Sequence, residues 1–252
     1  MNLKKFKVRE LIKLIENRPW IIFIVLAPVV FFLFRNLFNS YFEADEWFHF
    51  TYYLPLTRQP NGFLTALVST VINSGPLSGG QHVSPIATVI LFLSTKFFGL
   101  NFVPYAFVTL LLHTLNSFLV FLLIKILLYT MEQTTKNVFA FMGAIFFALA
   151  PTPIHTVTGA AAFYSYNVLS VTFFLLSVIL FKIAFIKGER EFIYFSFLLL
   201  FGALFTKETA AFLFLLLPFM VLIEYTSFAH LKTPPRWPKD SSDGGGITAY
   251  FT

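Results

Sequence analysis

The sequence predicts an all-α fold, a polytopic transmembrane helical bundle with about six spans. The chain of 252 residues is 57% hydrophobic and 12% charged, with a mean hydropathy of +0.77, whereas soluble domains are roughly 45–50% apolar and about 25% charged. Its apolar runs are long and continuous, which favours helices that satisfy their own backbone hydrogen bonds over the alternating pattern of barrel strands. The absence of cysteine excludes a disulfide framework, a thiolate metal site and a cysteine nucleophile.

The chain begins with a basic segment, residues 1–19, that we expect on the cytoplasmic side. Apolar residues from Val8 to Ile15 recur at helical spacing, which is typical of a basic amphipathic helix on a membrane surface. A solvated positive start that only sets the orientation fits equally well. Trp20–Phe38 follows as the first span. Because no small-residue cleavage site comes after it, we expect an anchor and not a cleaved signal peptide.

The transmembrane module is expected over residues 20–226. Residues 39–103 form its first extracytoplasmic loop with interfacial helices, and the apolar piece Ile86–Phe98 is short enough to be interfacial or re-entrant. The further predicted spans are Pro104–Tyr129, Val138–Ile154, Asn167–Ile186, Phe192–Phe205 and Ala210–Tyr225. Residues 227–252 contain the stretch TPPRWPKDSSDGGG, whose composition predicts a disordered cytoplasmic tail.

The distribution of basic residues indicates which segments cross the membrane. If Ile86–Phe98 does not cross, fourteen of the 18 Lys and Arg residues lie on the side of the N-terminus. If it crosses, every later group of basic residues changes side and this bias is lost. We therefore expect a non-crossing segment and a cytoplasmic N-terminus. The protein is then a multi-pass integral membrane protein of a bacterial or archaeal cytoplasmic membrane or of the endoplasmic reticulum membrane.

This topology places most of the remaining polar groups on or near the extracytoplasmic face. They are Glu43, Asp45, Glu46, His49, Arg58, His82, His155, Tyr164, Tyr166, Lys207 and Glu208. A charge at the bilayer centre costs roughly 2.5–3.5 kcal/mol on insertion scales, so such groups line cavities or stay near the surface. Asp45 and Glu46 closely follow the first span, and such a pair is suited to general-base catalysis. Two solvated acids after a helix are the open alternative.

The pair Lys207 and Glu208 lies in a turn between two short predicted spans. We therefore expect the turn somewhat below the surface, in a cavity. Lys207 in such a cavity is suited to hold a phosphate as a point charge. The alternative is a simple hairpin turn whose lysine snorkels towards the surface.

The histidines separate less clearly into ligands and structural residues. His155 is placed for a phosphate or hydroxyl contact, or for a capping role. His113 lies beside Asn116 within a span and is expected to form interhelical hydrogen bonds. His82 has no fixed ligand spacing with the acids, so the sequence predicts no metal site.

Several short motifs occur in an order that resembles one enzyme family. The first is Asp45-Glu46-Trp47-Phe48-His49-Phe50, at the start of the long loop. The others, in order, are Ser84-Pro85-Ile86, Phe98-Gly99-Leu100-Asn101, Leu111-Leu112-His113-Thr114-Leu115-Asn116, Ala150-Pro151, Ile154-His155-Thr156 and Thr206-Lys207-Glu208. Their succession resembles the multi-span glycosyltransferases of the GT-C fold, especially the protein O-mannosyltransferases and their bacterial and TPR-containing relatives.

The resemblance implies an enzyme that moves a sugar from a polyprenyl-phosphate-linked donor to a hydroxyl group of a protein or glycan. Asp45 matches the catalytic base of an inverting transfer, and we expect Glu46 to orient the acceptor or the sugar. The predicted donor-phosphate ligands are Lys207, His155, His82 and Arg58, and the predicted acceptor or sugar contacts are His49, Glu208 and Tyr164.

The implied partners are the polyprenyl-phosphate sugar, the protein or glycan acceptor and membrane lipids, without nucleic acid. No cofactor is implied, and the need for a divalent metal stays open.

Two features depart from the family: Ser84 stands where relatives usually carry a basic residue, and the relatives continue beyond six spans, as though this chain were an N-terminal fragment. Two other readings stay open, a transporter or lipid flippase and a non-catalytic, truncated protein of the same fold.

Overall fold

The computed structural model describes residues 18–42, 44–73, 84–149, 165–189 and 191–207, together with residues 210 and 219. Within these ranges the chain forms eight α-helices and one short 3-10 helix, and no strand. The all-α prediction is therefore confirmed for the described part of the chain. The expected basic segment before Arg18, most of the predicted span Ala210–Tyr225 and the predicted tail lie outside these residues.

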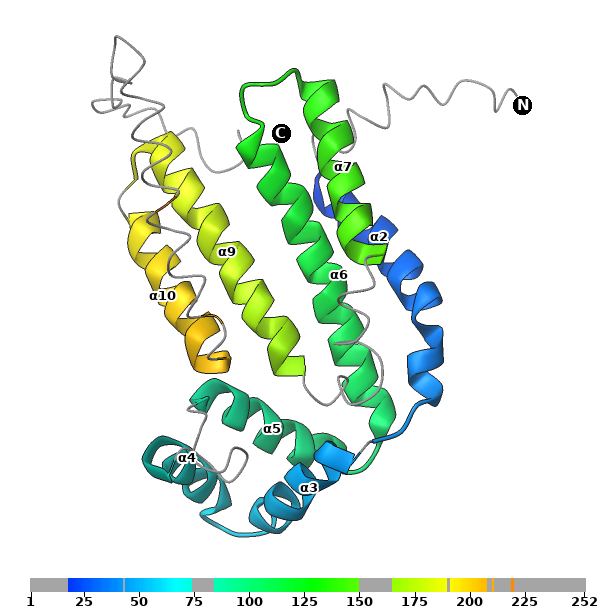
Figure 1. Ribbon diagram of the computed structural model, residues 1–252, viewed down its shortest axis with the longest axis vertical. Helices are drawn as coiled ribbons and strands as arrows, with labels where there is room; N and C mark the ends of the chain where they lie inside the picture. The colour runs from blue at the N-terminus through cyan, green and yellow to red at the C-terminus, as the bar shows by residue number, and fades with distance from the viewer. Residues whose placement is uncertain are drawn as a thin grey trace.

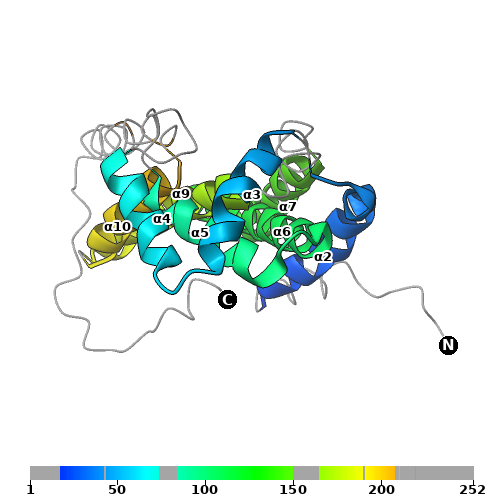
Figure 2. The same ribbon diagram turned by 90° about the horizontal axis from the view of Figure 1, so that it is seen from below.

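Five helices run side by side as a bundle, and three further helices lie across one end of it (Figure 1). The bundle consists of α2 (Trp20–Leu33), α6 (Phe102–Leu127), α7 (Gln133–Leu149), α9 (Ser165–Lys187) and α10 (Glu191–Thr206). The 3-10 helix η2 (Arg35–Asn39) leads from α2 into the crossing helices, which are α3 (Ala44–Thr57), α4 (Gly62–Asn73) and α5 (Pro85–Phe98). We call these three helices the α3–α5 layer, and Figure 2 views the molecule from this side.

Helix α6 is the central helix of the bundle and contacts α2, α7 and α9, while α10 packs on the far side of α9. The face of α7 towards the core carries Ala140, Ala144 and Ala148, which recur every fourth residue and are fully buried. Small residues at this spacing let two helix backbones approach closely, as in membrane helix pairs. The contact between α6 and α7 therefore follows directly from the sequence of α7.

Buried polar side chains connect α6 to its neighbours. His113 Nε2 lies 3.2 Å from the carbonyl oxygen of Ala148 on α7. Asn116 Nδ2 donates to the carbonyl oxygen of Val168 on α9 at 2.9 Å, and Thr172 Oγ1 donates to Asn116 Oδ1 at 2.7 Å. The prediction that His113 makes an interhelical hydrogen bond is confirmed, and Asn116 makes two more. These bonds fix the rotation of α7 and α9 about α6.

Two of the described helices are long and apolar enough to cross a membrane, namely Phe102–Leu127 and the part of α9 from Tyr166 to Lys187. Helices α2, α5 and α10 are apolar but shorter. The first predicted span, Trp20–Phe38, is not one helix: the α-helix ends at Leu33, and η2 turns the chain aside. The ring of Phe34, at the break, packs edge-on against His113 with centroids 5.7 Å apart. This inward anchor ends the helix earlier than the apolar run predicts.

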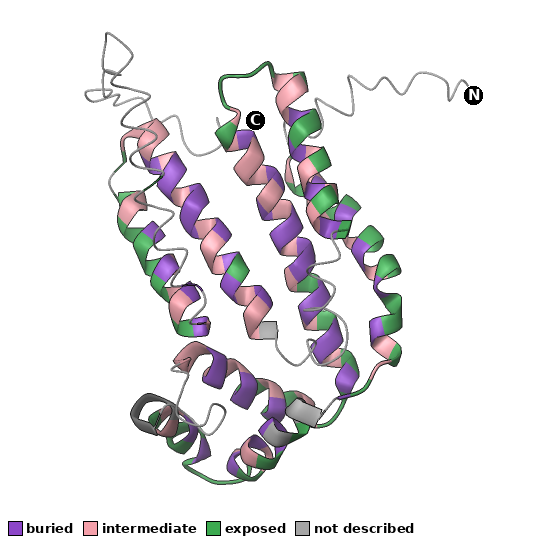
Figure 3. Cartoon of the chain, in the orientation of Figure 1, coloured by how far each residue is buried: buried purple, intermediate pink, exposed green. Residues whose placement is uncertain are grey.

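The outer faces of the bundle helices expose large apolar side chains (Figure 3). Examples are Phe32 on α2, Phe146 on α7 and Leu198 on α10. An exposed apolar surface spread over several helices is unusual for a soluble monomer. It suits helices that face hydrocarbon on their outer side.

Candidate functional site

The segment FEADEWFHF contains the start of a helix and not an extended loop. Helix α3 begins at Ala44, so Asp45 and Glu46 stand in its first turn. Negative residues are favourable there because the N-terminal end of a helix carries a partial positive charge. The structure describes the backbone at Asp45 and Glu46 but not their side chains, and Glu43 lies outside the described residues.

Aromatic rings hold the start of α3 against the start of α6. Phe42 lies with its ring centroid 5.1 Å from that of Phe102 and 5.5 Å from that of Tyr105. Phe50 packs on Phe42 at 4.6 Å. The Tyr105 hydroxyl donates to the carbonyl oxygen of Gly99 at 3.0 Å, which ties the same cluster to the end of α5. The aromatic residues that surround the acids in the sequence therefore position the first turn of α3.

The position of each predicted site residue along α3 determines which side of the helix carries it. His49 follows Asp45 by four positions, so the two residues share one side of the helix. This side continues through Tyr53 and Leu56 and is buried, with His49 only 7% exposed. His49, Tyr53 and Leu56 thus lie on the side of α3 that faces the rest of the protein.

Arg58 lies elsewhere. It is exposed just beyond the end of α3 and lines an open hollow of about 580 Å³ together with Trp47, Phe50, Thr51, Leu54 and Pro55. Helix α3 is about 20 Å long at 1.5 Å per residue, and Asp45 and Arg58 stand at its opposite ends. The structure does not bring Arg58 to the turn that carries Asp45.

Three buried hydroxyl residues on α3 and α5, namely Tyr53, Thr88 and Thr95, were not predicted from the sequence. Tyr53 on α3 is fully buried, and burial raises the pKa of its hydroxyl; the neighbouring Thr88 side chain on α5 partly offsets this effect. The Tyr53 oxygen nevertheless makes no hydrogen bond of good geometry. Thr95, one heptad beyond Thr88, is also buried. Thr88 and Thr95 are seven residues apart, so they lie on the same side of α5. This spacing in the sequence could have indicated that both hydroxyl groups face the interior.

Lys207 follows the last residue of α10 and is half-buried. Its backbone N–H donates to the carbonyl oxygen of Ala203 at 2.9 Å, and the Thr206 hydroxyl donates to that of Gly202 at 2.6 Å. These bonds close the last turn of α10. Glu208, the predicted neighbour in the site, lies outside the described residues.

Helix α5 separates the two main candidate groups. Helix α3 contacts α5, and α10 contacts α5 as well. The turn with Asp45 lies near the end of α5, where Phe98 packs on Tyr105 with centroids 5.3 Å apart. The end of α10, with Lys207, lies near the start of α5 (Figure 1). Both groups therefore belong to the same end of the bundle, but a ligand that touches both must reach across α5, a helix of about 21 Å.

Other predicted site residues lie outside the described residues: His82, His155 and Tyr164. Within the described ranges, no three His, Asp or Glu residues come close enough together to hold a metal ion. No protein-family model matches the chain, and neither a curated protein nor a solved structure matches it.

Proposed function

We propose that the chain is a membrane glycosyltransferase that takes a sugar from a polyprenyl-phosphate donor, as its motif order suggests. The observation that carries the proposal is the placement of FEADEWFHF. An acid pair opens a helix that aromatic rings fix to the bundle, at the same end to which α10 brings Lys207. A general base must be held rigidly to be effective, and the ring contacts of Phe42 and Phe50 support the start of α3.

The surroundings of the site suit a lipid-linked donor. Two helices are long and apolar enough to cross a membrane, and the outer faces of α2, α7 and α10 expose apolar side chains. A polyprenyl chain is itself apolar and partitions into such an environment. The α3–α5 layer would then lie at one membrane face, where the hydrophilic sugar meets its acceptor.

In the proposed reaction Asp45 accepts the proton of the acceptor hydroxyl while that oxygen attacks the anomeric carbon. The bond from this carbon to the phosphate oxygen breaks, and the polyprenyl phosphate leaves with the electron pair, so the configuration inverts. Glu46 orients the acceptor or the sugar. Lys207, with His155, stabilises the negative charge of the leaving phosphate.

The proposed role of Lys207 requires that Lys207 and Asp45 reach the same sugar. The attacking oxygen and the leaving phosphate lie on opposite sides of one carbon atom, so their two protein partners must reach the same sugar. Lys207 and Asp45 lie near opposite ends of α5. Asp45 therefore carries the proposal, and the role of Lys207 needs an experiment of its own.

The interior of the bundle favours a transferase over a transporter or flippase. A transport path needs polar groups that continue through the membrane and can contact the cargo. Two buried polar groups of α6 instead bind the neighbouring helices: His113 contacts the backbone of Ala148 on α7, and Asn116 bonds to Val168 and Thr172 on α9. These groups serve helix packing.

The test is sugar transfer by the reconstituted full chain with a panel of polyprenyl-phosphate sugars, comparing the unaltered chain with Asp45→Asn. We expect the substitution to lower transfer by at least about 10²-fold, the lower range for loss of a general base, while donor binding and membrane insertion are unchanged. Transfer at the unaltered rate would remove Asp45 from this role. Donor binding without any transfer by the unaltered chain would favour the non-catalytic reading, and no binding of any donor would overturn the proposal.

The role of Lys207 is tested separately by donor binding. We expect Lys207→Ala to weaken binding of the polyprenyl-phosphate sugar by about tenfold, because one charge-assisted phosphate contact is lost. Lys207→Arg should retain most of the affinity. Lys96→Ala, on the exposed face of α5, is the control and should bind the donor normally. Unaltered affinity in Lys207→Ala would place the phosphate elsewhere.

A further inference from the structure

A second candidate site lies at the end of the bundle opposite the α3–α5 layer. A groove with a cavity of about 270 Å³ runs between α6 and α9, and most of its lining is aliphatic. The aliphatic lining consists of Leu119, Leu122, Ile126, Leu176, Ile179, Leu180, Ile183 and Ile186. Nothing in the proposed transfer uses this groove.

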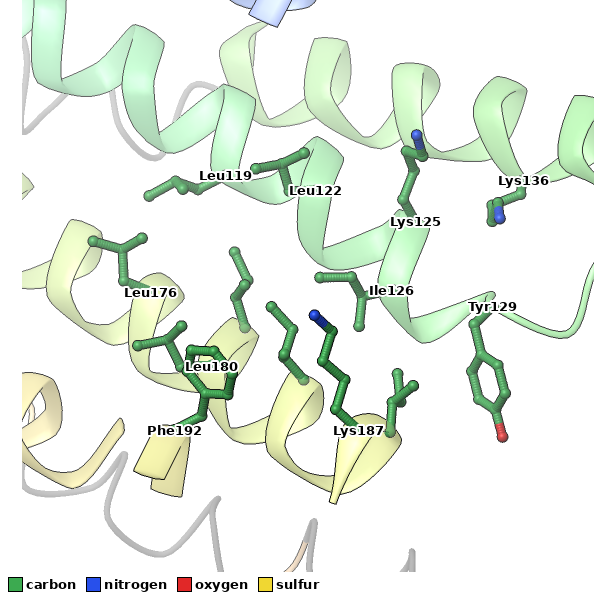
Figure 4. Close-up of a pocket in the computed structure, with 13 residues that line it drawn as sticks. Leu119, Leu122, Lys125, Ile126, Tyr129, Lys136, Leu176, Leu180, Lys187 and Phe192 are labelled. Atoms are coloured by element: carbon green, nitrogen blue, oxygen red, sulfur yellow. The ribbon is translucent and has the colours of Figure 1, made fainter. Parts of the chain in front are cut away.

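Three lysines surround one end of the groove: Lys125 in the last turn of α6, Lys136 near the start of α7 and Lys187 at the end of α9. Figure 4 shows Lys187 reaching from α9 towards α6, with Lys125 and Lys136 on the side of α6 and α7. Lys125 lines the groove with its aliphatic stem, while its Nζ is buried and lies 5.7 Å from the centroid of the Phe121 ring. No acidic residue lines the groove, and the nearest acids in sequence, Glu132, Glu189 and Glu191, are exposed. The charged residues that line this end of the groove are therefore all basic.

The dimensions of the groove correspond to one leaflet of a bilayer. From Leu119 to Tyr129 on α6, and from Leu176 to Lys187 on α9, the lining extends for about 15 Å at 1.5 Å per residue. The hydrocarbon core of a bilayer is about 30 Å thick, so one leaflet contributes about 15 Å. The cations stand where the helices end, at the depth expected for lipid phosphate groups.

We propose that this groove, which we call the lysine groove, binds one anionic glycerophospholipid, with an acyl chain between α6 and α9 and its phosphate at the lysines. The apolar walls and the cluster of cations match the two parts of such a molecule. A free anion would leave the apolar walls empty, and a neutral lipid would not use the lysines. The proposal does not depend on the proposed sugar transfer.

The test uses the purified full chain in mixed micelles that contain equal amounts of phosphatidylglycerol and phosphatidylcholine with the same acyl chains. Native mass spectrometry counts the lipids that stay bound. We expect the unaltered chain to retain phosphatidylglycerol over phosphatidylcholine by about 25-fold, since each of the two lysines that are not buried, Lys136 and Lys187, contributes about a fivefold preference. Inorganic phosphate at millimolar concentration should not displace the lipid.

Two variants separate the charge from the groove. Lys136→Gln/Lys187→Gln, which removes the two lining lysines that are not buried, should abolish the preference for phosphatidylglycerol. Leu180→Trp, which fills the groove without a change of charge, should lower the retention of both lipids. The matched control, Arg35→Gln/Lys96→Gln, removes the same charge at the other end of the bundle and should keep the preference.

Equal retention of the two lipids by the unaltered chain would overturn the proposal. So would an unchanged preference in the double lysine variant, or the same loss of preference in the control variant. Displacement by inorganic phosphate would also overturn it, because it would identify a simple anion site. Each readout is independent of glycosyl transfer, so failure here leaves the proposed function untouched.

Discussion

Tyr53 illustrates how a single buried hydroxyl affects the α3–α5 layer. It lies on the inner side of α3, two turns after the turn of Asp45, and its neighbour across the interface is Thr88 of α5. Burial favours the neutral phenol over the phenolate, because a charge without solvent is costly. The pKa of Tyr53 is therefore raised above the ordinary value of 10.0.

The raised pKa predicts a loss of stability in alkaline solution. Above about pH 10 the unfolded chain releases the Tyr53 proton while the folded chain keeps it, so the free energy of unfolding falls by up to about 1.4 kcal/mol per pH unit. Below pH 10 both states are protonated, and Tyr53 contributes no pH dependence. Alkaline unfolding followed by circular dichroism in detergent should be less steep for Tyr53→Phe than for the unaltered chain. The exposed Tyr41→Phe should behave as the unaltered chain, and identical curves for all three would contradict this account.

At the scale of elements, the aromatic cluster joins α3, α5 and α6. Phe42 precedes α3, yet it packs on Phe50, Phe102 and Tyr105, while Tyr105 bonds to the carbonyl of Gly99 at the end of α5. Gly99 has φ = 56°, a conformation that costs other residues about 1 kcal/mol or more. This turn connects α5 to α6 and places Tyr105 in contact with Phe42, which precedes α3.

Removing the central ring should loosen the start of α3. We expect Phe42→Ala to lower the free energy of unfolding by about 3 kcal/mol or more, because a buried ring is replaced by a cavity. The measurement is thermal unfolding in detergent, with protease sensitivity near residue 43 as a local readout. Phe146→Ala is the control, since that ring is 77% exposed, and it should change stability little. Equal effects of the two substitutions would show that the cluster does not hold α3.

The sequence predicted the helical class and the positions of α5, α6, α9 and α10 within a few residues, because the apolar runs there are long and end at turn residues. It also predicted the interhelical role of His113, since a polar residue within an apolar helix needs a partner. It did not predict the end of α2 at Leu33, which depends on the tertiary contact of Phe34 with His113. The separation of Arg58 from Asp45 could not be foreseen either, because it follows from α3 being a continuous helix.

The whole molecule has two different ends. The α3–α5 layer, with the acid pair, covers the end where α2 stops and α6 begins, and the lysine groove opens at the end where α6 and α9 stop. Basic residues favour the cytoplasmic side of a membrane. The two ends should therefore face opposite sides, with the α3–α5 layer outside. Both proposals assume this arrangement: the transfer at one end and the lipid at the other.

The most direct measurement of this central claim is the accessibility of single cysteines, which the absence of native cysteine makes unambiguous. Gln59→Cys lies in the exposed turn after α3, and Thr130→Cys in the exposed turn between α6 and α7. In intact cells a membrane-impermeant maleimide should label Gln59→Cys at once, and Thr130→Cys only after the membrane is opened. Labelling of both positions from the same side would contradict the two-ended arrangement.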